Sequence, residues 1–262
     1  MIKYNYYYTI TAGRTGTAWL SKFIFENLNI ESIHEPIGIY DFGKEMPDIK
    51  IMRAFNNFGN CEIVKEFWRN KLLALSLKKN FAETNHTLSK CGLIENIHNT
   101  NLASKTLFLI LRRNKINQCL SYINRGDFNT NITIPWQWYL LPKYNKKIIQ
   151  PDLFLGLKKF RTVFWYIFEM EARQLYYLMR FKNRLNFLEI TLEELNDNDG
   201  AKKFLSSVGI KIIKPKLPPK TNQSLYIEDN NLINEVRTIY NSIKIDIEEI
   251  VNSFIKSGKL LH

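Results

Sequence analysis

The chain has 262 residues, of which 45% are hydrophobic and 13% aromatic, enough to form the core of one sizeable α/β domain. Lys and Arg outnumber Asp and Glu by 37 to 25, and the net charge of +12 favours anionic ligands such as nucleic acid, an anionic membrane surface or a phosphorylated or sulfated small molecule. Three widely spaced cysteines argue against a disulfide framework or a zinc site, and no apolar run is long enough to span a bilayer, so we expect a cytoplasmic protein without an integral membrane segment.

The first half of the chain predicts alternating strands and helices. Aromatic and β-branched runs indicate the strands, and apolar residues at helical spacing indicate the helices. In chain order the expected elements are a strand at 4–11, a glycine turn at 12–16, a helix at 17–27, a strand at 32–34, a helix at 62–77, a strand at 81–84 and a helix at 88–97. Residues 106–111 (TLFLIL) then form a continuous apolar run, typical of a central parallel strand buried on both faces.

The second half continues the alternation and ends in helices. Its expected elements are a helix at 114–124, a helical segment at 136–141, a long helix at 155–181, a strand at 185–190, a helix at 201–208 capped by Gly209, a loop at 215–224 and a closing amphipathic helix at 231–254. Alternating strands and helices predict a central parallel sheet flanked by helices, with right-handed crossovers. We expect residues 1–262 to form a single domain.

A glycine-containing turn joins the first strand to the first helix. In Gly13-Arg14-Thr15-Gly16-Thr17, backbone N–H groups and the helix N-terminus favour an anion, Gly16 permits close approach, and Arg14 adds a fixed positive charge. An ordinary tight turn would use similar residues. The nucleoside triphosphate P-loop requires a Gly-Lys-Ser/Thr that is absent, which counts against ATP and GTP as ligands.

A second basic site follows the buried strand at 106–111. Arg113 stands at the expected strand end, and Ser121 lies two turns along the next helix if that helix begins near residue 114. An arginine fork matches phosphate geometry, so the two side chains could converge on one phosphate. Alternatively, Arg113 is solvated or salt-bridged and Ser121 is a surface residue.

The two motifs together resemble those of sulfotransferases that use 3′-phosphoadenosine 5′-phosphosulfate (PAPS). The turn, which runs on to Ala18 and Trp19, is similar to the family's 5′-phosphosulfate loop, and the arginine-to-serine step is similar to its 3′-phosphate site. The arginine in the turn is typical of carbohydrate, tyrosylprotein and bacterial members. The resemblance implies a P-loop-type three-layer fold, adenosine 3′,5′-bisphosphate as product and no metal. The donor-binding residues that it implies are Gly13, Arg14, Thr15, Gly16, Thr17, Ala18, Trp19, Arg113, Ser121 and Lys220.

Sulfonyl transfer also requires a base that removes the proton of the acceptor hydroxyl. Glu35 follows the expected strand at 32–34, and Glu35-Pro36 resembles the Glu-Pro of carbohydrate sulfotransferases, whose glutamate is the base. His86 is the rival, because cytosolic members use a histidine after a comparable strand. Glu83, Asn85 and His86 could instead bind the acceptor. The resemblance gives Arg14 the stabilisation of the transferring group.

The remaining resemblance concerns the second half of the chain. Lys220 lies in a late loop similar to one that closes over the donor, and Leu192 replaces the usual tyrosine of a strand-to-helix segment. Residues 135–181 match nothing specific, and we expect them to supply a helical acceptor site and lid. Trp136, Trp138 and Tyr139 could stack on a sugar ring or belong to the core.

The sequence therefore predicts a sulfotransferase that moves a sulfonyl group from PAPS to an acceptor hydroxyl. A carbohydrate or glycolipid is the favoured acceptor, while a tyrosine or small metabolite stays open. Two alternatives remain: a P-loop kinase that uses ATP, and a non-enzymatic nucleic-acid-binding protein, for which the charge alone argues. Because the basic residues are scattered, we expect no nucleic-acid partner.

Overall fold

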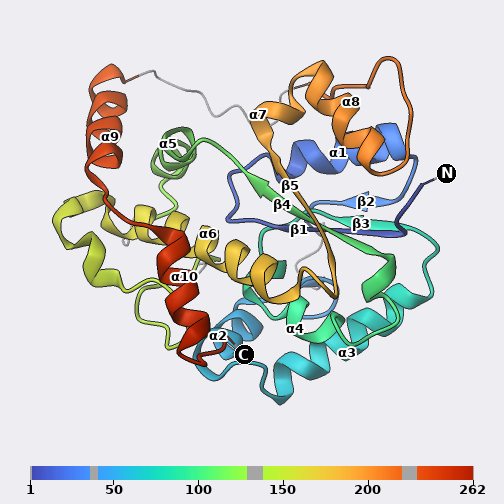
Figure 1. Ribbon diagram of the computed structural model, residues 1–262, viewed down its shortest axis with the longest axis horizontal. Helices are drawn as coiled ribbons and strands as arrows, with labels where there is room; N and C mark the ends of the chain where they lie inside the picture. Colours follow the sequence, from blue (N-terminus) through green and yellow to red (C-terminus); the bar gives the residue numbers. More distant parts are fainter. Residues whose placement is uncertain (1, 36–40, 129–137, 220–228, 262) are drawn as a thin grey trace.

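Five parallel strands form one sheet in the computed structural model, in the order β2-β3-β1-β4-β5 (Figure 1). The structure describes residues 2–35, 41–128, 138–219 and 229–261. The strands are β1 (Tyr6–Ile10), β2 (Ser32–Ile33), β3 (Phe81–Glu83), β4 (Thr106–Arg112) and β5 (Asn186–Thr191). β1 is central, with Tyr6 opposite Phe81 of β3 and opposite Thr106 of β4. The predicted α/β class and parallel sheet are confirmed.

The side-chain alternation of the central strands builds a separate core on each face of the sheet. Phe108 and Ile110 of β4 join one buried cluster, whereas Leu107, Leu109 and Leu111 join the other. All five side chains are at most 3% exposed. The apolar run of β4 is thus explained by burial on both faces, as the sequence predicted.

Helices cover both faces of the sheet and make three layers (Figure 1). On one face lie α1 (Thr17–Leu28), α7 (Leu192–Leu195) and α8 (Asn198–Ser207), with Trp19 and Phe23 packed against Phe204 and its neighbours. The other face carries α2 (Ile49–Phe58), α3 (Glu62–Ser76), α4 (Leu93–Ile97), α5 (Lys115–Arg125), α6 (Arg161–Phe181), α9 (Asn230–Ser242), α10 (Ile247–Lys256) and the 3₁₀ segments η2 (Leu88–Lys90), η3 (Ala103–Lys105) and η5 (Pro151–Phe160).

Several predicted helices are interrupted, each for a local reason. The helix expected at 155–181 begins only at Arg161, because Lys158, with a φ of 47°, kinks the 3₁₀ segment η5 that precedes it. The closing helix expected at 231–254 is two helices, since Asp246 accepts a hydrogen bond from the Glu249 N–H at 2.9 Å and caps α10. Gly92, with a φ of 90°, divides the helix expected at 88–97 into η2 and α4.

One further expectation was wrong, and one helix was not predicted. Residues 138–141, the described part of the helical segment expected at 136–141, are not helical, and the Trp138 carbonyl instead accepts a hydrogen bond from Lys90. No helix was expected where α2 lies, although Ile51, Met52 and Phe55 give α2 a buried face. Within the described ranges, no helix is both long enough and apolar enough to cross a membrane.

Candidate functional site

The turn between β1 and α1 has an unusual backbone that holds its N–H groups near the start of α1. Gly13, Arg14 and Gly16 have φ angles of 90°, 54° and 85°. A non-glycine residue in this left-handed region costs about 1–2 kcal/mol, so Arg14 is held there by its surroundings. Gly16 is the N-cap of α1 and offers no side chain to the helix. Within the described chain, the N–H groups of residues 13–17 have no protein acceptor.

Side chains from α5 and α6 fix the carbonyl groups of this turn. The Tyr166 hydroxyl donates to the Ala12 carbonyl at 2.5 Å, and Gln118 Nε2 donates to the Gly13 carbonyl at 2.8 Å. The Tyr122 hydroxyl donates to both carbonyls, at 2.8 and 2.9 Å. These buried bonds orient the peptide groups, so the turn is preorganised rather than adaptable.

The second basic motif lies directly against this turn. Arg14 Nε donates to Ser121 Oγ at 3.0 Å, and Arg113 Nη1 donates to the Arg14 carbonyl at 3.0 Å. Arg14 thus contacts Ser121, which is 107 positions away in the sequence, and Arg113, which is 99 positions away. The structure brings together the two motifs that the sequence analysis had recognised separately.

The topology of the sheet explains why the motifs meet. β1 and β4 are neighbours, and both turns leave from their carboxyl ends. α1 then packs on one face of the sheet, whereas Cys119, Leu120 and Tyr122 of α5 pack on the other. Adjacent strands whose helices go to opposite faces open a crevice at their carboxyl ends, which is where parallel α/β proteins bind ligands.

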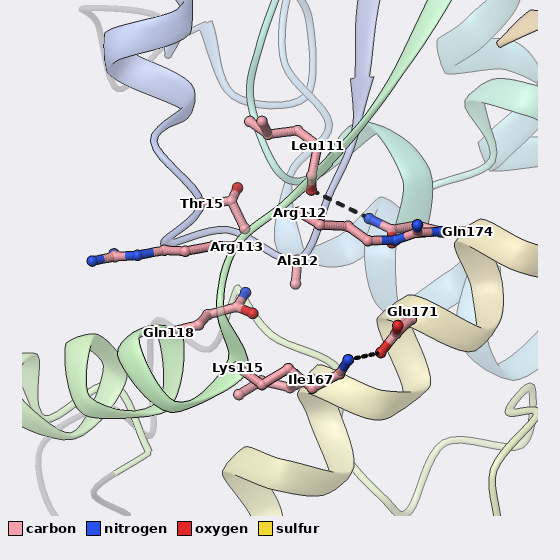
Figure 2. A pocket seen from close by; sticks show the side chains of 10 residues that line it. All are labelled: Ala12, Thr15, Leu111, Arg112, Arg113, Lys115, Gln118, Ile167, Glu171 and Gln174. Atoms are coloured by element: carbon pink, nitrogen blue, oxygen red, sulfur yellow. Dashed lines mark hydrogen bonds and ion pairs between the residues drawn. The ribbon is translucent and has the colours of Figure 1, made fainter. Parts of the chain in front are cut away.

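The two arginines at the carboxyl end of β4, Arg112 and Arg113, have different surroundings. Arg112 is held within the protein by Glu189 Oε2 at 2.6 Å and Gln174 Oε1 at 3.0 Å. Figure 2 shows that Arg113 extends away from the small cavity beneath the turn. That cavity has a volume of about 30 Å³, room for ordered water and far too little for a nucleotide. A larger anionic ligand would have to lie on the side toward which Arg113 points.

The side chains or carbonyl groups of the remaining residues of the predicted donor loop mostly make hydrogen bonds within the protein. Thr15 is 1% exposed, and its hydroxyl pairs with Thr11 Oγ1 at 2.6 Å, so it is not available to a ligand. The buried Thr17 gives its carbonyl to Thr84 Oγ1 at 2.8 Å, and Ala18 is half-buried. Trp19 donates to the Pro218 carbonyl at 2.8 Å, which ties the late loop to the start of α1. Lys220, like Pro36 and Trp136, lies outside the described residues.

Glu35, the predicted base, stands at the end of β2. Its carboxylate Oε1 lies 3.4 Å from His34 Nε2, and its side chain is 48% exposed. Burial lowers the pKa of His34, an effect that the Glu35 charge opposes. Glu35 is therefore open to solvent at the rim, close enough to His34 and Lys90 for its charge to act on both.

His86, the rival base, packs against the turn itself. A side chain added at Gly13 would place its Cβ 3.1 Å from His86 Cγ, so the ring lies on the loop backbone. His86 Nδ1 is 2.8 Å from Lys90 Nζ, and the ring stacks on Tyr139 with centroids 5.5 Å apart. Burial, followed by the positive charge of Lys90, holds the pKa of His86 well below its usual 6.5.

Glu83 and Asn85, which the sequence offered as acceptor ligands, are both fully buried. Glu83 pairs with Lys71 Nζ at 2.7 Å and accepts a hydrogen bond from Asn85. Asn85 Oδ1 also accepts from the Thr87 N–H at 2.8 Å. Both side chains stabilise the segment after β3, and neither is open to an acceptor molecule.

Lys90 is the residue at this site that the sequence analysis missed. Its side chain is 0% exposed, and its amine contacts His86, Tyr166 and the Trp138 carbonyl. The Trp138 ring packs against Phe42, with ring centroids 5.1 Å apart. No group of three or more potential metal ligands occurs among the residues that the structure describes. None of the protein-family models, curated proteins or solved structures compared with the chain matches it.

Proposed function

We propose that this chain is a sulfotransferase that moves a sulfonyl group from PAPS to an acceptor hydroxyl. The observation that carries the proposal is the contact between the two anion-binding motifs, Arg14 with Ser121 and Arg113 with the Arg14 carbonyl. PAPS has anionic groups at both its 5′ and 3′ ends, so it requires two adjacent basic sites. A P-loop-type arrangement, with the donor across the carboxyl ends of β1 and β4, meets that requirement.

The chemistry follows from the charges around the turn. The acceptor oxygen attacks sulfur, the bond from sulfur to the bridging phosphate oxygen breaks, and adenosine 3′,5′-bisphosphate leaves. Negative charge grows on the bridging oxygen, where Arg14 and the unpartnered N–H groups at the start of α1 stabilise it. The resemblance assigns the 3′-phosphate to Arg113 and Ser121.

The acceptor proton goes to one of two groups beside the turn. The Glu35 carboxylate is open to solvent, which suits a base for a large acceptor. His86 lies closer to the loop backbone and is kept unprotonated by its surroundings. A carbohydrate or glycolipid hydroxyl remains the favoured acceptor class.

Ligand binding tests the donor assignment before any acceptor is known. Adenosine 3′,5′-bisphosphate should raise the melting temperature of the full chain, whereas ATP at the same concentration should raise it far less. Arg14→Ala should weaken bisphosphate binding roughly 10- to 100-fold, the effect of losing a charge-assisted hydrogen bond. Arg69→Ala is the matched control, because Arg69 pairs with Glu62 at an exposed site on α3.

Turnover is then measured by a screen of sugar, glycolipid, tyrosine-peptide and phenol acceptors with radiolabelled PAPS. Label transfer that disappears in Arg14→Ala and persists in Arg69→Ala would support the proposal. Stronger stabilisation by ATP than by the bisphosphate would instead favour a kinase. Binding to oligonucleotides that the bisphosphate fails to displace, with a steep salt dependence, would favour nucleic acid as the ligand.

A further inference from the structure

The amine of Lys90 is surrounded by hydrogen-bond acceptors and has no carboxylate partner among the described residues. One contact is to the carbonyl of Trp138, which can only accept. A second, at 3.1 Å, is to the oxygen of Tyr166, whose hydrogen is already donated to Ala12. The third is His86 Nδ1 at 2.8 Å. The geometry therefore suits an ammonium group that donates to three acceptors at once.

The same geometry also satisfies a neutral amine, with one rearrangement. A neutral Lys90 has two hydrogens for Trp138 and Tyr166 and one lone pair, which would accept from His86 if the ring carried its proton on Nδ1. His86 then has a lone pair on Nε2. With Lys90 charged, the ring carries its proton on Nε2 instead. The imidazole is uncharged in both arrangements.

We propose that His86 and Lys90 form a proton relay in which His86 Nε2 takes the proton of the acceptor hydroxyl and Lys90 receives the charge. The acceptor O–H bond breaks as an Nε2–H bond forms, the Nδ1–H bond breaks, and an Nζ–H bond forms. The relay rests on the proposed function only in naming the acceptor hydroxyl as the proton source. Lys90 is a positioning residue that acts through His86, and Nε2 is the ring nitrogen left for a substrate.

The surroundings keep both states accessible near neutral pH. Burial lowers the pKa of Lys90 from 10.5 to about 7, so half of the pairs carry the lysine charge at that pH. Because the pKa of His86 is also lowered, a doubly protonated ring is disfavoured beside the ammonium. The charged or titratable groups that act on His86 are Lys90, His34, Arg125 and Arg14, and those that act on Lys90 are Cys91, Arg173, Glu35 and Asp127.

The relay predicts a tautomer change that nitrogen NMR detects without donor or acceptor. In the full chain labelled with ¹⁵N-histidine, His86 should carry its proton on Nε2 at about pH 6 and on Nδ1 at about pH 8 or above, with a midpoint near 7. His86→Gln assigns the resonance among the 4 histidines. One tautomer over the whole range, or an imidazolium at the lower pH, would overturn the relay.

Substitution of the lysine provides the second measurement. In Lys90→Met the pH-dependent exchange between the two ring nitrogens should be lost. In Lys115→Met, which removes another partly buried lysine that pairs with Glu171 at 2.7 Å, the exchange should be unchanged. A folded Lys90→Met protein that keeps the exchange near pH 7 refutes the role of the lysine.

The two proposals fail separately. If Lys90→Met does not fold, the titration of the unsubstituted chain still decides the relay. Because that titration contains no PAPS, the relay can stand when bisphosphate binding fails. It can also fail when bisphosphate binding succeeds, in which case Glu35 remains as the proposed base.

Discussion

Substitution of Arg113 by alanine should weaken the binding of the donor's 3′-phosphate and leave the binding of its 5′ end almost unchanged. Its guanidinium donates to the Arg14 carbonyl at 3.0 Å and extends away from the small cavity under the turn (Figure 2). If Arg113 binds the 3′-phosphate, Arg113→Ala should weaken adenosine 3′,5′-bisphosphate but leave adenosine 5′-monophosphate almost unchanged. The comparison between the two nucleotides therefore isolates one phosphate.

The size of the effect follows from the kind of bond that is lost. A hydrogen bond between an arginine and a phosphate contributes about 1.5–3 kcal/mol, so the dissociation constant should rise roughly 10- to 100-fold. Isothermal titration calorimetry at low ionic strength measures it directly. The difference between the nucleotides should shrink as salt is added, because screening weakens the partly exposed contact.

Three outcomes would contradict this assignment of Arg113. An equal loss of affinity for both nucleotides would mean that Arg113 supports the turn and not the 3′-phosphate. An unchanged bisphosphate affinity would remove Arg113 from the donor site altogether. A similar loss in Arg69→Ala, which changes an exposed ion pair on α3, would trace the effect to net charge rather than to position.

Three further substitutions test the turn and the buried groups around it. Gly16→Ala should lower the melting temperature and abolish stabilisation by the bisphosphate. The φ of 85° is strained for alanine, and the added Cβ would lie 2.4 Å from Leu192 Cδ1. An unchanged melting curve with ligand would contradict this expectation. Tyr166→Phe should cost about 1–2 kcal/mol in urea unfolding, since the hydroxyl bond to the Ala12 carbonyl is lost, and a neutral effect would show that the bond contributes nothing. Burial raises the pKa of Glu95 from 4.5 to about 7, so the folded state resists ionisation of this carboxyl. The free energy of unfolding of Glu95→Gln should therefore rise relative to that of the unsubstituted chain as pH rises from 4.5 to about 7. Parallel curves of unfolding free energy from about pH 4 to pH 8 would refute the reasoning.

The fold could be predicted from the sequence where one physical signal dominates. The apolar run at 106–111 has a single explanation, burial on both faces of a sheet, and β4 confirmed it. The closing helix was wrong because two signals competed. Apolar periodicity continues from 231 to 254, but the backbone becomes extended at Ile243 and Asp246 caps a new helix. Periodicity reports the buried face and not the continuity of the helix.

The part of the site that could be predicted from the sequence is the part that follows from the topology of a parallel sheet. Turns at the carboxyl ends of neighbouring parallel strands converge, which is why Arg14 and Arg113 could be placed at one rim from sequence alone. The contact of Arg14 with Ser121 depends on the left-handed backbone of the turn, which sequence does not specify for an arginine. The sequence likewise did not indicate that the hydroxyl of Thr15 turns inward to Thr11.

Lys90 carried no recognisable signal, because a lysine four residues after a histidine is ordinarily solvated. Its burial is created by residues far along the chain, the hydroxyl of Tyr166 and the carbonyl of Trp138, which close over the segment after β3. Tertiary packing of this kind cannot be derived from a local pattern. For the same reason the sequence did not distinguish Glu35 from His86 as the base, because nothing in it indicated that Lys90 contacts His86.

An amine rather than a carboxylate beside His86 fits the anion site that we propose at the turn. A carboxylate at Nδ1 would add negative charge near the turn and would compete with the donor for Arg14 and Arg125, whose charges already act on His86. It would also raise the pKa of the ring and keep it protonated, which removes a base. A buried amine that can lose its proton avoids both effects. In the proposed relay, a pair that starts with a neutral amine becomes positively charged only when the proton arrives, as negative charge develops on the group that leaves.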